Sequence, residues 1–313
     1  MESSLARKAL QEVGLPTDDA CGEESPRRFS DGGWFRFEIP SVEGPRVLEA
    51  VVQEGKDLKV PIHRISQGSG IQLLTDAEIS EMALIGAQEG IEVSLFVGPR
   101  AGFEPSAMHL AQNGGVLRPR LRGMASLRAA LDDAFRAYDL GIRSVLIADE
   151  GLIALHHDLK QRGVWPEDLK VKVSVMLAAA NPVSIRMIAD LDVATYNCPT
   201  DLSVEQLATI RRVTSVPLDI YVESPDDIGG FVRYREIAEF IRYTAPVYLK
   251  FGVRNAPNIY PSGLHWESQA IQLGRERVRR ARIAWEAIQR LQWSDRMSAL
   301  PCKTDDLAIP KPF

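Results

Sequence analysis

The sequence predicts an α/β fold, a (β/α)8 TIM barrel formed by a single domain, and three observations carry this prediction. Short apolar runs recur along the chain, and eight of them can be distinguished. Stretches with helical periodicity separate most of these runs. The turn after the first run lacks the Gly-rich loop that is typical of a doubly wound dinucleotide-binding sheet, the alternative fold.

Each apolar run has the length and composition of a strand in a parallel sheet, which is buried on both faces. Turn residues bound most of the runs. In chain order, the eight predicted strands cover residues 35–40, 62–66, 92–97, 144–149, 172–177, 193–198, 218–222 and 247–251.

The intervening helices are expected to begin at residues that cap helix amino termini. Thr75 precedes one helix and has Glu78 at the position of a capping box. Ser126 and Ser203 are the expected caps of two later helices. A long amphipathic helix over residues 268–291 follows the last strand. These helices complete the alternation that a barrel requires.

The third strand–helix unit contains a long insertion, EPSAMHLAQNGGVLRPRLRG. Long loops in compact domains often act as lids over active sites. Arginines at positions 100, 118, 120 and 122 would let this loop face an anion, and a solvated basic loop is the alternative.

The polar ends of the chain predict the domain boundaries. The first segment is rich in polar and turn residues and resembles a linker, and the last carries three prolines. We therefore expect a polar amino-terminal extension over residues 1–33, the barrel over residues 34–294 and a carboxyl-terminal tail over residues 295–313.

Composition argues against several classes of protein. The chain has 313 residues, of which 45% are apolar and 25% charged, with a net charge of −5, so nucleic acid or an anionic membrane is not the expected partner. No apolar run is long enough to cross a bilayer, and the start of the chain lacks the apolar core of a signal peptide. Three widely spaced cysteines indicate reduced thiols in the cytoplasm. We expect no metal site and no cofactor.

Polar residues interrupt three strands that become neighbours when the barrel closes. Side chains alternate between the faces of a strand, and the inward ones near the carboxyl ends form the active site of a barrel. By this alternation Glu38 on the first strand and Lys250 on the last point inward. The seventh strand presents three polar residues on one face, and we expect all five side chains to converge; the three are Asp219, Tyr221 and Glu223.

A buried lysine beside carboxylates suits two roles. It can form an ion pair that only holds the barrel closed, or it can be an amine whose pKa is tuned for catalysis. In the catalytic interpretation Lys250 is a Schiff-base nucleophile or a proton carrier. Glu38 and Glu223 would tune this amine, and Tyr221 would relay a proton. Asp219 belongs to the same group of catalytic candidates.

A second set of residues is expected to bind the substrate. Arg254 follows Lys250 by four residues, and a guanidinium binds carboxylate or phosphate through two hydrogen bonds, although a loop arginine can equally lie in solvent. The segment HRISQGSG ends the second strand, and its glycines allow an anion to approach the backbone. The predicted substrate-binding residues are Arg254, Arg64, Ser66, Gln67, Asn197, Arg100 and His265.

Three segments resemble the collagenase-like U32 peptidase family. EIPSVEGPRVLEAVVQEG resembles its opening segment, in which Glu, Pro and a small residue precede a helix, and GIRSVLIADEGLI resembles its fourth-strand segment. YLKFGVRN is similar to its Lys-x-x-x-Arg motif, with Lys250 and Arg254 in place. The resemblance extends over residues 35–290. It implies a barrel of this type and the positions of Glu38, Lys250 and Arg254.

The chain also departs from that family. Members carry a cluster of cysteines, in many cases for an iron–sulfur centre used in oxygen-independent hydroxylation, and this chain has no such cluster. Hydroxylation of that kind is therefore not expected. Proteolysis is not expected either, since no credible nucleophile–base pair is found.

These observations together predict a cytoplasmic enzyme that acts on a small anionic metabolite. Lysine–carboxylate acid–base or Schiff-base chemistry, of the lyase or isomerase type, fits the polar residues best. A hydrolase, as the family name suggests, is the alternative enzyme class. A barrel that has lost catalysis and binds a ligand or a partner protein is the alternative outside enzymes. Assembly into a homo-oligomer is left open.

Overall fold

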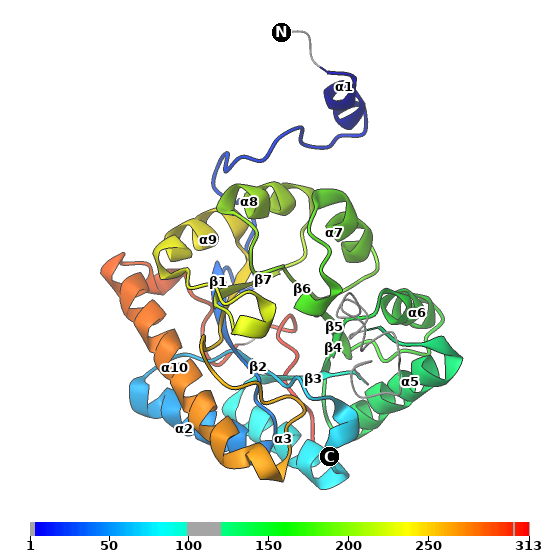
Figure 1. Ribbon diagram of the computed structural model, residues 1–313, viewed down its shortest axis with the longest axis vertical. Coiled ribbons are helices and arrows are strands. Elements are labelled where there is room, and N and C mark those ends of the chain that lie inside the picture. Colours follow the sequence, from blue (N-terminus) through cyan, green and yellow to red (C-terminus); the bar gives the residue numbers. More distant parts are fainter. Residues whose placement is uncertain (1–3, 99–119, 303, 313) are drawn as a thin grey trace.

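The computed structural model describes residues 4–98, 120–302 and 304–312 and shows a closed barrel of eight parallel strands in sequential order (Figure 1). The predicted fold class is thus confirmed. The strands are β1 (Phe35–Pro40), β2 (Arg64–Ser66), β3 (Glu92–Phe96), β4 (Ser144–Ile147), β5 (Lys170–Val173), β6 (Thr195–Asn197), β7 (Leu218–Glu223) and β8 (Val247–Phe251).

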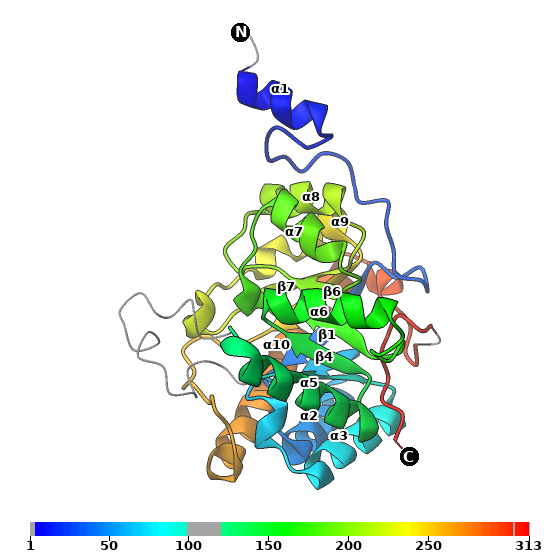
Figure 2. The same ribbon diagram turned by 90° about the vertical axis from the view of Figure 1, so that its right-hand side faces the viewer.

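Helices surround the barrel and cover the outer face of the sheet (Figures 1 and 2). The apolar side chains on the outer strand faces and the inner helix faces form one large core, which explains why most strands read as apolar runs. The helices are α1 (Leu5–Glu12), α2 (Pro45–Leu58), α3 (Asp76–Glu89), α5 (Gly123–Asp139), α6 (Glu150–Gln161), α7 (Pro182–Ala189), α8 (Val204–Val213), α9 (Ile237–Thr244) and α10 (Glu267–Arg290).

Short 3₁₀ turns fill several of the connections, and one of them changes a predicted strand. The fifth strand was expected over residues 172–177, but β5 is shifted toward the amino terminus because the chain turns immediately after Ser174. The 3₁₀ turns are Ile71–Leu73, Val175–Leu177, Asp226–Ile228, Tyr234–Glu236, Leu264–Trp266 and Ser294–Arg296.

Two of the three predicted helix caps are confirmed. Thr75 and Ser203 each cap a helix within a complete capping box, at the start of α3 and α8 respectively. The expected cap at Ser126 is wrong, because α5 begins one turn earlier, at Gly123. The long insertion of the third unit lies largely outside the described residues.

Segments from both ends of the chain cover the amino-terminal end of the barrel. Phe29 and Leu307 pack with Tyr248, an inward side chain of β8. At the same end of the barrel, Arg36 forms an ion pair with Asp306, with 3.0 Å between the charged atoms. The carboxyl ends of the strands lie at the opposite end of the barrel.

Helix α1 extends away from the barrel, and none of its residues is buried (Figures 1 and 2). Within the described ranges, no helix is both long and apolar enough to cross a membrane.

Candidate active site

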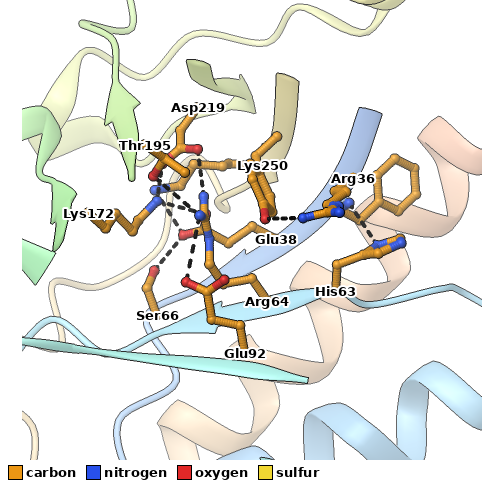
Figure 3. A network of polar contacts seen from close by, with 12 residues as sticks. Arg36, Glu38, His63, Arg64, Ser66, Glu92, Lys172, Thr195, Asp219 and Lys250 are labelled. Carbon is orange, nitrogen blue, oxygen red and sulfur yellow. Dashed lines mark hydrogen bonds and ion pairs between the residues drawn. The ribbon is translucent and has the colours of Figure 1, made fainter. Parts of the chain in front are cut away.

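A cluster of charged side chains fills the barrel interior (Figure 3). Its central members come from five strands and are each at most 1% exposed: Glu38, Arg64, Lys172, Asp219 and Lys250. Glu92 of β3, 4% exposed, lies at the edge of the cluster, 3.8 Å from Arg64. The strand register explains the convergence, since Glu38 on β1 pairs with both Arg64 on β2 and Lys250 on β8. The structure therefore brings Glu38, Asp219 and Lys250 together, as the strand order predicts. Lys172 on β5 completes the cluster, although it was not among the predicted site residues.

Glu38 is the centre of this cluster. Its Oε1 accepts a hydrogen bond from Ser66 Oγ at 2.7 Å and lies 3.1 Å from Lys250 Nζ. Its Oε2 accepts from Arg64 Nε and Lys172 Nζ, both at 2.8 Å. Burial alone would raise the pKa of Glu38, but the charges of the arginine and the two lysines outweigh burial and hold the pKa well below its usual range. Glu38 is therefore an ionised counter-ion for three cations.

The deepest part of the cluster is saturated with partners. Asp219 accepts from Arg64 Nη2 at 2.5 Å and from Thr195 Oγ1 at 3.1 Å, and it also contacts Lys172 Nζ. The guanidinium of Arg64 lies 3.5 Å from the centre of the Tyr248 ring. Burial and the charge of Arg64 lower the pKa of Lys172 to about 8, although both carboxylates oppose that change. This layer is a closed ion network.

The layer nearer the mouth is less completely paired. Within the described part of the chain, Lys250 Nζ has one carboxylate partner, Glu38, and it lies 4.5 Å from the centre of the Tyr221 ring. Both residues line a cavity of about 60 Å³ at the carboxyl ends of the strands, together with Ser66 and Asn197. Asn197 is 2% exposed, and its Oδ1 has no hydrogen-bond partner among the described residues. A buried amide oxygen without a partner costs free energy, so this wall suits a ligand that donates a hydrogen bond.

Glu223 corrects the expected polar row on β7. A β-bulge between Tyr221 and Glu223 changes the alternation, so that Glu223 does not share the inward face. Its carboxylate instead accepts from the Tyr234 hydroxyl at 2.8 Å and from the backbone N–H of Arg254 at 2.9 Å. Arg280 of α10, outside the barrel, lies 3.6 Å from the same carboxylate. The expectation that Glu223 meets Lys250 is therefore wrong.

The residues predicted on β2 lie deeper or are more firmly bound than expected. Arg64 is fully buried between two carboxylates rather than at the mouth, because its parity matches that of Glu38. The amide of Gln67 is engaged by the backbone of its own loop, where it donates to the Gly70 carbonyl at 3.2 Å. It also accepts from the Gly70 N–H at 3.1 Å. Ser66 and Gln67 both line the cavity, and the Ser66 hydroxyl is held by Glu38.

The remaining predicted binding residues are not brought to Lys250. The Arg254 side chain is 58% exposed on the rim, where it lies 3.5 Å from Asp226. His265 is exposed in the 3₁₀ turn that precedes α10. Arg100 lies outside the described residues. Within the described chain, no group of three or more potential ligand side chains is arranged to hold a metal ion.

No family model matches the sequence, and no curated protein matches it. Solved structures do share the fold. A putative fructose-1,6-bisphosphate aldolase from Coccidioides immitis is 12% identical, with 83% of this chain and 91% of that chain covered and a TM-score of 0.50. A putative copper homeostasis protein CutC from Streptococcus agalactiae is 10% identical, with coverages of 69% and 98% and a TM-score of 0.48.

A U32 peptidase is also among the similar structures. It is 17% identical, with 73% of this chain and 98% of that chain covered and a TM-score of 0.43. At such identities the likeness defines the fold class and assigns no activity, because TIM barrels host many unrelated reactions. The chain is thus a TIM-barrel protein with a charged interior that reaches a cavity at its mouth.

Proposed function

We propose that this protein is an enzyme that acts on a small anionic carbonyl metabolite, by lysine chemistry of the lyase or isomerase type. The observation that supports this proposal is the position of Lys250. Its amine is buried, has one carboxylate partner, and lies on the wall of a cavity at the end of the barrel where TIM-barrel enzymes hold their active sites. A purely structural lysine would be expected to resemble Lys172, which contacts two carboxylates.

In the proposed reaction the neutral amine of Lys250 adds to the substrate carbonyl, and loss of water gives an iminium. That cation withdraws electrons from the neighbouring carbon, so that a carbon–carbon or carbon–hydrogen bond can break. The proton that Lys250 must first release passes to solvent at the mouth, because Glu38, 3.1 Å away, is held ionised by its three cationic partners. Burial and the nearby charge of Glu38 raise the pKa of Tyr221, so its phenol stays protonated and can donate to the substrate oxygen.

The test is borohydride trapping with a panel of small 2-oxo acids. Reduction of an iminium leaves a stable secondary amine, which adds the mass of the reduced acid minus one water to one lysine. We expect this mass on the peptide that contains Lys250 and not on the one that contains Lys172. Lys250→Met should abolish the label, whereas the exposed variant Lys311→Met should keep it. Absence of a label with every carbonyl compound would contradict Schiff-base chemistry at this site.

The alternative of a binding protein has one observation in its favour. Both oxygens of Glu38 are already engaged by donors, which leaves this carboxylate little capacity to accept a further proton. If the protein binds a small anion at the mouth, and Lys250→Met weakens that binding without any turnover of the anion by the wild type, the binding function is the better description.

A further inference from the structure

A second cavity, of about 270 Å³, adjoins the one that Lys250 lines. Its size is close to the lower end of the range for small-molecule sites, roughly 300 Å³. Six residues border both cavities, so the two spaces adjoin at the mouth. The shared residues are Pro40, Ser41, Tyr221, Pro225, Asp227 and Tyr260.

Arg277 of α10 lines this second cavity and is 5% exposed. Its Nη1 donates to the backbone carbonyl of Ser41 at 3.2 Å, while its Nε has no acceptor among the described residues. Burial lowers the pKa of Arg277, although the nearby Tyr260 and Glu43 oppose that change. A buried guanidinium with so few acceptors costs free energy, which an anionic ligand would offset.

Arg277 has fewer partners for its charge than Arg64 has. Arg64, equally buried, meets two carboxylates at 2.5 Å. Arg277 has no carboxylate oxygen within 4.0 Å in the described part of the chain. The nearby carboxylate of Glu43 is held by the backbone N–H groups of Gly68 and Ser69, both at 2.9 Å.

The backbone at Ser41 supports a built site. Ser41 has a φ of 59°, in the left-handed region that a non-glycine residue rarely adopts. Such conformations are unfavourable for a residue with a side chain, and they cluster at functional sites. In this conformation the Ser41 carbonyl accepts from Arg277, while its hydroxyl lies 2.5 Å from the Tyr260 hydroxyl. The turn after β1 thereby fixes two walls of the second cavity.

We propose that Arg277 binds the carboxylate of the substrate and so places the substrate carbonyl at Lys250. This inference rests on the proposed function, and it assigns the substrate to the short-chain oxo acids. Tyr221 connects the two groups, since it borders both cavities and its ring lies beneath the Lys250 amine. A carboxylate fits better than a phosphate dianion because Asp227, an exposed acid, borders the same region.

The test measures how Lys250 labelling depends on pyruvate concentration in the full chain. Loss of a charge-assisted hydrogen bond should raise the half-saturating concentration about tenfold or more in Arg277→Met, with Arg277→Lys intermediate. The label at saturation should be unchanged. Arg279→Met, on the exposed side of the same helix, is the matched control and should behave as the wild type. An unchanged pyruvate dependence in both Arg277 variants would overturn the inference and leave the proposed function intact.

Lactate separates the two proposals, because it carries the carboxylate but no carbonyl and forms no iminium. We expect lactate to raise the Tm of the wild type and of Arg279→Met, to raise that of Arg277→Lys less, and to leave that of Arg277→Met unchanged. This readout holds even if no pyruvate label forms, in which case the proposed chemistry fails but the carboxylate site stands. Absence of a lactate effect on the wild type, or a larger effect of inorganic phosphate, would overturn the assignment. If Arg277→Met does not fold, Arg277→Lys decides both measurements.

Discussion

Two lysines in the barrel interior, Lys172 and Lys250, are equally buried and share one carboxylate, but they differ in their other partners. Lys172 contacts Glu38 and Asp219 deep in the barrel and does not line the mouth cavity. Lys250 contacts Glu38 alone among the carboxylates of the described residues, and it lines that cavity. Lys172 completes an ion network, whereas Lys250 faces a cavity at the mouth of the barrel. Burial and charge alone therefore do not distinguish the two lysines. The number of carboxylate partners and the contact with the cavity do.

The largest expected effect is on the stability of the deep network. Asp219→Ala removes a carboxylate from both Arg64 and Lys172, which then share Glu38, while Arg64 keeps Glu92 as a more distant partner at 3.8 Å. Breaking a buried ion pair in this way costs about 3–5 kcal/mol in the free energy of unfolding. Urea denaturation monitored by circular dichroism measures this loss. Glu89→Gln, which breaks the partly exposed pair with Lys56, should cost less than about 1 kcal/mol. Equal losses in the two variants would contradict the distinction.

Replacing either lysine should lower the free energy of unfolding less than Asp219→Ala does. Lys250→Met should cost roughly 1–3 kcal/mol of unfolding free energy, because Glu38 keeps Ser66, Arg64 and Lys172 as donors. Lys172→Met should cost more, since it takes a partner from two carboxylates.

Labelling separates the same two variants. Iminium trapping should disappear in Lys250→Met and persist in any folded Lys172→Met protein. If both variants lose the label while both remain folded, the roles assigned to the two layers are wrong.

Sequence patterns predicted the barrel and the meeting of Glu38 with Lys250, because strand alternation and strand order are properties of the sequence. They failed at Glu223, since a bulge inserts one residue into β7 and no local pattern in LDIYVE indicates it. The inward parity of Lys172 was visible in the fifth strand, but its partners on β1 and β7 were not.

Arg277 carried no signal in the sequence. It is one of several arginines along an amphipathic helix, and only packing distinguishes it from the exposed ones. The number of hydrogen-bond and ion-pair partners of a charged side chain depends on distances across the barrel. Tertiary structure fixes these distances, and no local sequence pattern does.

A pH dependence tests the deep lysine separately. The pKa of Lys172 is lowered in the folded protein to about 8, from an ordinary value of about 10.4 in the unfolded chain. Between these values the unfolded state binds more protons, so stability rises with pH. The unfolding free energy of the wild type, relative to Lys172→Met, should increase by about 1 kcal/mol per pH unit between pH 8 and 10. A relative stability that falls over this range would show that the pKa of Lys172 is not lowered.

The smallest stability change is expected where the two layers meet on β6. Thr195 belongs to the deep network, and Thr195→Val removes a donor to Asp219, at a cost of about 1–3 kcal/mol. Asn197, two residues further toward the mouth, has an amide oxygen without a partner, so Asn197→Leu should change the unfolding free energy by less than about 1 kcal/mol.

For ligand binding, the order of the two variants should be reversed, with the larger effect in Asn197→Leu. Asn197→Leu should weaken the pyruvate dependence of labelling about tenfold, since the amide oxygen faces the ligand space, whereas Thr195→Val should leave it unchanged. Urea denaturation and the labelling titration on the same two proteins provide both values. A large stability loss in Asn197→Leu together with normal labelling would place Asn197 in the structural layer, and the boundary between the layers would then lie closer to the mouth, between Asn197 and Lys250.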